Sequence, residues 1–188
     1  ICSLIRQDSI DEFISFINEK NISISSKINF SMYETNSFLI KKEPTLIEYA
    51  AFFGSIRILK YLYLNKVDLT PSLWIYGIHS NNAELIQFLI EKKVEPEDKT
   101  YCKCLLESIK CHHNDIADYI QNNLLIKDGQ SNIDEEIVNY SLKYSNYSYF
   151  PSDWLQNDAF FYLCFYNYTE LINIFMTYTE LNNNLKMI

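Results

Sequence analysis

The residue types that could hold a metal ion gather in one segment, CKCLLESIKCHH at residues 102–113. Zinc in proteins is usually held by four cysteine or histidine side chains that converge as a tetrahedron. Cys102 and Cys104 lie two residues apart on a predicted helix, so they point about 200° apart around its axis. Cys111 and His112 fall at the following turn. The four side chains are therefore poorly placed to converge on one ion, and we expect no metal and no cofactor. A metal- or redox-linked module of these four residues is kept as an alternative.

Two other reactive side chains stand alone in the sequence. His79 has no nucleophile or paired carboxylate near it in the sequence, so we interpret it as a surface or packing histidine. Cys164 takes the place of the small residue Ala51 in the repeat described below, which predicts a buried, unreactive thiol. The sequence contains no glycine-rich phosphate loop and no Gly-X-Ser-X-Gly segment. We therefore predict that the protein is not an enzyme.

The elements that would position these residues are repeated helix pairs, most clearly TLIEYAAFFGSIRILKYLYLNKVD at residues 45–68. Thr45 and Glu48 fit a capping box at the start of a first helix, and Gly54 suits the tight turn after it. A second helix follows, with apolar residues at helical spacing: Ile58, Leu59, Leu62 and Tyr63. A pair this short cannot bury its own apolar stripe, so it needs neighbouring pairs.

Further copies of the pair follow from aligning the sequence with itself. When Gly54 is placed on Asn81, Ile58 falls on Leu85, so a turn-forming residue and an apolar residue are both retained. Trp74 then falls on an apolar position of the first helix, and we expect it in the core. Related copies occupy three other segments: residues 1–22, 108–120 and 159–175. In the last of these, Asn167 takes the turn position of Gly54. The sequence therefore predicts an all-α fold, a solenoid of stacked antiparallel helix pairs.

This layout resembles the ankyrin repeat, whose unit has two small residues in the first helix, a glycine turn and an apolar stripe in the second helix. Ala50 and Ala51 supply the small pair here, and TLIE at 45–48 stands where the family opens with Thr-Pro-Leu-His. The segments PSLWIYGIHSNNAELIQFL and SIKCHHNDIADYI are similar to an uncharacterised domain that precedes ankyrin arrays in parasitic flagellate protozoa of the trichomonad type. That resemblance covers nearly the whole chain and implies a fold without an assigned chemistry.

Composition limits the class of protein and of partner. Only 3 Gly and 4 Pro among 188 residues favour helices with short connections over a turn-rich β-sandwich. The formal net charge of −8 disfavours nucleic acid and anionic membranes as partners, because those need clustered Lys and Arg. Five cysteines at irregular spacing do not fit a disulfide framework, so we predict a cytoplasmic location. No apolar run approaches the roughly 18–20 residues that span a bilayer.

The chain is expected to divide into four parts. These are ankyrin-like repeats over 1–125, a long connection within them at 23–43, a linker at 126–135, and further repeats of the same array over 136–188. The linker is indicated by the turn dipeptide Asp128-Gly129. Within the long connection, one short helix is expected near residues 37–40. The aromatic run at 147–150 is expected to replace the second helix of its unit.

The predicted concave face carries an aromatic ledge formed by exposed positions of the first helices. Its proposed protein-binding residues are Tyr49, Phe52, Phe53, Tyr76 and His79. Aromatic side chains beside polar ones are typical of a protein-binding surface. The alternative is that the 23–43 connection folds back and covers the ledge. We expect a non-catalytic protein–protein interaction scaffold that binds a protein through this face. A structural component embedded in a larger cytoplasmic or cytoskeletal assembly is the other interpretation.

Overall fold

The computed structural model describes residues 1–29, 34–126, 133–150 and 159–185, and within these ranges the protein is all-helical. Twelve α-helices and one 3₁₀ helix follow one another along the chain, without a strand among these residues. One isolated antiparallel bridge joins Lys27 to Thr45. The all-α class is therefore confirmed.

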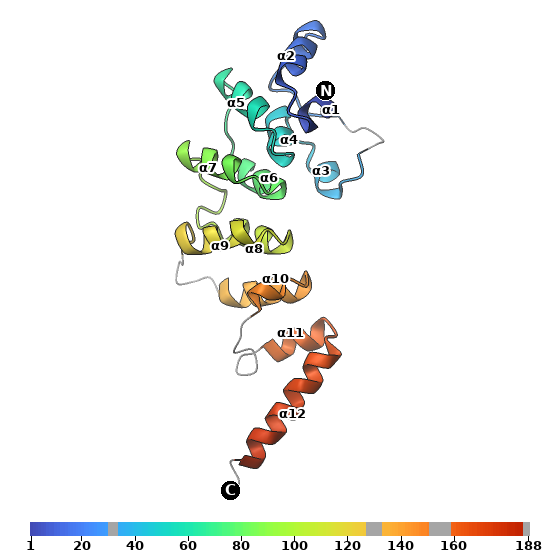
Figure 1. The fold of residues 1–188 in the computed structure, drawn as a ribbon, viewed down its shortest axis with the longest axis vertical. Coiled ribbons are helices and arrows are strands. Elements are labelled where there is room, and N and C mark those ends of the chain that lie inside the picture. Colours follow the sequence, from blue (N-terminus) through green and yellow to red (C-terminus); the bar gives the residue numbers. More distant parts are fainter. Residues whose placement is uncertain (30–33, 127–132, 151–158, 186–188) are drawn as a thin grey trace.

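The helices form a row that runs from the N-terminus to the C-terminus (Figure 1). In chain order they are α1 (Cys2–Arg6), α2 (Ile10–Glu19), α3 (Ser37–Lys42), α4 (Leu46–Phe52), α5 (Ile56–Leu64), α6 (Leu73–Ser80), α7 (Ala83–Glu91), α8 (Cys102–Lys110), α9 (Asn114–Asn123), α10 (Ile133–Lys143), η1 (Tyr147–Tyr149), α11 (Ala159–Phe165) and α12 (Thr169–Leu185). The first helices of successive pairs, α1, α4, α6, α8, α10 and α11, each contact the next. None of the helices in the described ranges has the length and apolar character needed to cross a bilayer.

A residue in the left-handed region ends the first helix of every pair. These residues, with φ between +50° and +67°, are Asp8, Gly54, Asn81, His112, Ser145 and Asn167. Glycine adopts this conformation without a steric penalty, and aspartate and asparagine tolerate it better than other residues. The self-alignment of the sequence had placed Asn81 and Asn167 on Gly54, and the turn geometry agrees with that alignment.

A line of side-chain hydrogen bonds, which we call the spine, joins each helix pair to the one before it. In five pairs the residue directly after the left-handed turn donates to a main-chain carbonyl of the preceding pair. The bonds are Ser55 Oγ to Ile5 O (2.5 Å), Asn82 Nδ2 to Gly54 O (3.0 Å), His113 Nδ1 to Ile78 O (2.7 Å), Asn146 Nδ2 to Ile109 O (2.8 Å) and Tyr168 Oη to Leu142 O (2.6 Å). Each of these carbonyls also accepts a main-chain N–H bond from its own turn, so the spine gives it a second donor, from the next helix pair.

The hydrophobic core runs through the middle of the row. Of the predicted stripe of the second helix, Ile58, Leu59 and Leu62 are completely buried and Tyr63 is half-buried. Trp74 is also completely buried, as expected, and its indole Nε1 donates to the Val94 carbonyl at 2.6 Å. A buried indole N–H needs such a partner because an unsatisfied donor is costly in an apolar surrounding.

The long connection contains the expected short helix, α3, although it extends to Lys42. The Asn36 side chain caps it by accepting from the main-chain N–H groups of Phe38 and Leu39. Leu39 is buried, so α3 is anchored to the row rather than extended into solvent. At the end of the connection, Thr45 and Glu48 form both bonds of the predicted capping box at the start of α4.

The second half of the chain departs from the regular pairs. Residues 127–132 of the expected linker, including Asp128-Gly129, lie outside the described residues. Helix α10 begins at Ile133, so the last three residues assigned to that linker are helical. Acidic residues in the first turn of α10 suit the positive end of the helix dipole. After α10 the aromatic run forms the single 3₁₀ turn η1 where a second helix would otherwise lie.

Candidate functional site

The aromatic ledge is covered, and the expectation that it faces solvent is wrong for its central residues. Tyr49, Phe52 and Tyr76 are only 2%, 9% and 4% exposed. The cause is α3, whose Phe38 stacks on Phe52 with ring centroids 5.8 Å apart and meets Tyr76 edge to face at 5.1 Å. The 23–43 connection therefore folds back over the ledge, which was the alternative interpretation.

Arg6 of α1 links the 23–43 connection to the row of helices through polar contacts. Its guanidinium forms an ion pair with Glu34 at 2.7 Å and donates from Nε to the Tyr49 hydroxyl at 2.8 Å. It also lies over the Phe53 ring, 4.8 Å from the centroid, and Phe53 is half-buried. Burial raises the pKa of Tyr49 to about 12, so the hydroxyl stays protonated and donates to Glu34 at 3.3 Å.

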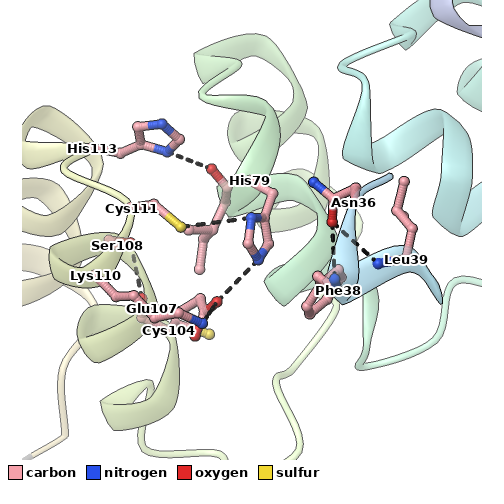
Figure 2. A network of polar contacts seen from close by, with 11 residues as sticks. Asn36, Phe38, Leu39, His79, Cys104, Glu107, Ser108, Lys110, Cys111 and His113 are labelled. Atoms are coloured by element: carbon pink, nitrogen blue, oxygen red, sulfur yellow. Dashed lines mark hydrogen bonds and ion pairs between the residues drawn. The ribbon is translucent and has the colours of Figure 1, made fainter. Parts of the chain in front are cut away.

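The fifth ledge residue, His79, lies at the C-terminal end of α6 and is not a surface histidine. Its side chain is 15% exposed. One side of the imidazole packs on Phe38 and Phe52, with ring centroids 4.4 and 5.1 Å away. The other side faces α8 (Figure 2). His79 is therefore the point at which the covered ledge meets the next helix pair.

Three side chains with metal-ligating or nucleophilic atoms converge at this point. Cys111 Sγ lies 3.6 Å from His79 Nδ1, and Glu107 Oε1 lies 3.0 Å from His79 Nε2. Lys110 Nζ contacts the same carboxylate oxygen at 2.7 Å. Although Nε2 is close to Glu107, it is buried and is not aligned for a hydrogen bond. The thiol, the imidazole and the carboxylate form the cluster that we call the α6–α8 site (Figure 2).

The electrostatics of the α6–α8 site favour an ionised carboxylate and a protonated thiol. Burial opposes ionisation of Glu107, but the hydrogen bond and charge of Lys110, together with the neighbouring His79, outweigh it and lower the pKa of Glu107. Burial, assisted by the nearby Glu107 charge, raises the pKa of the Cys111 thiol to about 11. A thiol–imidazole–carboxylate arrangement can support nucleophilic catalysis, but only when the thiolate is accessible at working pH. The Cys111 thiol, with its raised pKa, does not supply such a thiolate.

The four residues weighed for a metal module do not come together. Cys104 is buried in the core of α8, and the His112 ring lies against the Tyr144 carbonyl, with Nε2 2.8 Å from the oxygen. Of that set only Cys111 belongs to a group of potential ligands in the described ranges, and its companions are His79 and Glu107. Sequence reasoning missed this group because its members come from two different units. When the repeats are aligned, His79 falls on Lys110, which lies next to Cys111 in the sequence. Comparing matching positions of neighbouring first helices could therefore have found this group.

Cys164 is exposed, and the prediction of a buried thiol there is wrong. The equivalent residue Ala51 is completely buried in α4. Helix α4 packs against first helices on both sides, α1 and α6, whereas the main contacts of α11 within the described ranges are with α10 and its own partner α12. The small-residue position of the repeat is therefore buried only where a neighbouring pair lies against it.

Comparisons with known proteins give no match for this chain. No family model, no curated protein and no solved structure matches it. What the chain does must therefore be inferred from its own residues and their arrangement.

Proposed function

We propose that the chain is a non-catalytic scaffold that binds another protein and is built as an ankyrin-type helical solenoid. Three observations support the solenoid: the row of contacting first helices, the left-handed turn residue in every pair, and the spine. In such an array each pair contacts only its neighbours, which leaves long surfaces free for a partner. The resemblance to the ankyrin-associated domain of flagellate protozoa then reflects a common fold.

The observation that carries the proposal is a set of exposed apolar side chains on the last helix pair. Phe161 and Phe165 of α11 are 64% and 69% exposed, and their rings stack on each other. Ile174 and Met176 of α12 are about half exposed. Phe161 and Phe165 lie about one turn apart on α11 and form an exposed aromatic pair. Exposed apolar side chains that gather on one surface are typical of protein-binding sites, and aromatic residues often contribute most of the binding energy. We therefore place the binding surface on α11 and α12.

The ledge is less suitable as a binding surface than α11 and α12. Tyr49, Phe52 and Tyr76 could contact a partner only after α3 leaves them, which would also expose Leu39. Phe53 and His79 are half-buried and engaged with Arg6 and Phe38. A partner at the ledge would have to replace these contacts, whereas Phe161 and Phe165 of α11 are already exposed.

The surroundings proposed for this scaffold are cytoplasmic. All five cysteines are free thiols, which suits a reducing compartment. The net charge of −8 supports a protein partner rather than nucleic acid.

The test compares proteins retained from a lysate of the source cells by variants of the chain. Phe161→Ser with Phe165→Ser removes the aromatic part of the proposed surface. Leu64→Ser is the matched control, because Leu64 is an equally exposed apolar residue on α5. We expect proteins retained by the unmodified chain and by the control to be lost from the double variant. Retention of the same proteins by all three, with unchanged circular dichroism, would contradict the proposed surface.

A further variant separates this surface from the ledge. Replacing Phe52 and Phe53 together with alanine alters the ledge and leaves α11 and α12 intact. If the α11–α12 surface binds the partner, this variant retains it. Loss of the partner from this variant alone, with a preserved fold, would return the binding site to the ledge.

A further inference from the structure

We propose that His79, Glu107 and Cys111 bind a divalent cation of the zinc class and so link α6 to α8. This inference does not depend on the proposed scaffold function. The cation would join two successive helix pairs by coordination, in addition to the packing and the spine that already join them.

The distances suit coordination with a small adjustment. One potential ligand atom from each residue lies within 4.8 Å of the other two. Zinc binds sulfur at about 2.3 Å and nitrogen or oxygen at about 2.0–2.2 Å, so ligand atoms of a tetrahedral site lie roughly 3.5 Å apart. Cys111 Sγ lies 3.6 Å from His79 Nδ1, and Glu107 Oε1 lies 3.0 Å from His79 Nε2. A single cation takes only one of these two nitrogens, so coordination requires the imidazole or one of the other two side chains to turn.

The His79 imidazole is oriented so that it could serve as a ligand of a cation. Cys111 and Glu107 lie on the same side of the imidazole, while Phe38 lies on the opposite side (Figure 2). Nε2 is buried 3.0 Å from Glu107 Oε1, but it makes no hydrogen bond to that carboxylate. A rotation of the ring about its Cβ–Cγ bond aims one nitrogen between the sulfur and the carboxylate. The aromatic rings behind His79 limit that rotation and hold the imidazole at the α8 side.

The ligand types select the class of cation. The cation would displace the proton of the Cys111 thiol on binding. The resulting thiolate, with an imidazole and a carboxylate, suits Zn²⁺ or Co²⁺, whereas Mg²⁺ and Ca²⁺ take oxygen ligands almost exclusively. Three protein ligands leave one position of a tetrahedron for water, and the partial exposure of His79 and Glu107 allows water to reach it. Lys110 opposes binding, because its ammonium group occupies the Glu107 oxygen at 2.7 Å. Removing that charge should therefore strengthen binding.

The test is a titration of the full, reduced, metal-free chain with Co²⁺, followed by competition with Zn²⁺. Thiolate coordination gives Co²⁺ a sulfur-to-metal charge-transfer band in the near ultraviolet. We expect this band at one Co²⁺ per chain and its loss on addition of Zn²⁺. Cys111→Ser should abolish the band. Glu107→Gln should weaken Co²⁺ binding by at least about tenfold, since loss of even an outer partner of a metal ligand costs on the order of 10–100-fold.

Two further variants make the outcome decisive. Cys164→Ser removes an exposed thiol outside the α6–α8 site and should leave the titration unchanged. Lys110→Met keeps the aliphatic stem and should tighten Co²⁺ binding. The proposal is overturned if the folded chain gives no thiolate band, or if the band survives Cys111→Ser. It is also overturned if the band disappears in Cys164→Ser, because the thiol involved is then elsewhere.

Discussion

The same sequence pattern is buried in the middle of the row and half-exposed at its end. In α5, Ile58, Leu59 and Leu62 are completely buried. Their counterparts in α12 (Leu171, Ile172 and Phe175) are only partly buried. Both segments form a helix pair with a left-handed turn residue, so the local structure is the same. The difference shows that the pattern specifies the pair, while the neighbouring pairs determine how much of it is buried.

The contacts of the two regions explain this difference. The α4/α5 pair lies between the α1/α2 pair and the α6/α7 pair, whereas α11 contacts α10 on one side only within the described ranges. In a repeat array each unit is stabilised by its own fold and by its interfaces with adjacent units. A middle pair has two such interfaces. Substitutions at equivalent positions should therefore cost more in the middle than at the end.

The largest contrast is expected for the apolar stripe. Leu59→Ala should lower the free energy of unfolding by about 2–5 kcal/mol, because it leaves a cavity in a closely packed region. Ile172→Ala at the equivalent position of α12 should cost about 1 kcal/mol or less, because the side chain buries less area. Urea denaturation followed by circular dichroism measures both values. Equal losses would contradict the idea that neighbours determine burial.

A second contrast is expected along the spine. Asn146 is 2% exposed and bonds both the Ile109 carbonyl and the Asn114 side chain at 2.8 Å. Asn146→Ala should cost about 1–3 kcal/mol, because the Ile109 carbonyl and the Asn114 side chain each lose a hydrogen bond in a buried place. Tyr168→Phe removes the corresponding bond to Leu142 in the last pair.

The expected cost of Tyr168→Phe is about 0.5–1.5 kcal/mol, since Tyr168 is half-buried and water can reach its surroundings. The same denaturation experiment compares the two variants. If Tyr168→Phe were the more destabilising, the spine would be weaker in the middle than at the end, against the comparison above.

Sequence reasoning reached the features that repeat within each unit. The turn positions at Asn81 and Asn167 and the burial of Trp74 follow from matching one copy with another. The position of α3 over the ledge could not be predicted in this way, because the sequence pattern around Phe52 and Tyr76 does not indicate which segment packs on them. The α6–α8 site was also missed. It is formed between units, where the alignment gives the register but not the side-chain directions.

A third contrast concerns the turn between the helices of a pair. Gly54 has φ +67°, and an added Cβ would lie 3.1 Å from the Asn82 side chain. Gly54→Ala should therefore cost about 1–2 kcal/mol through left-handed strain, and the spine bond to Asn82 would have to shift. Asn167→Gly at the equivalent turn of the last pair should instead be neutral or stabilising by less than about 1 kcal/mol. Thermal unfolding distinguishes the two, and a stabilising Gly54→Ala would show that this turn is not strained.

The smallest effect is expected for a surface ion pair between units of the middle region. Lys60 of α5 and Glu84 of α7 are 2.7 Å apart, and both side chains are largely exposed. Exposed pairs contribute little because water and salt screen them, so Lys60→Met should change the free energy of unfolding by less than about 0.5 kcal/mol. Denaturation at low and high salt measures this. A loss as large as that of Leu59→Ala would mean that surface charge, rather than buried stripes and the spine, joins the middle pairs.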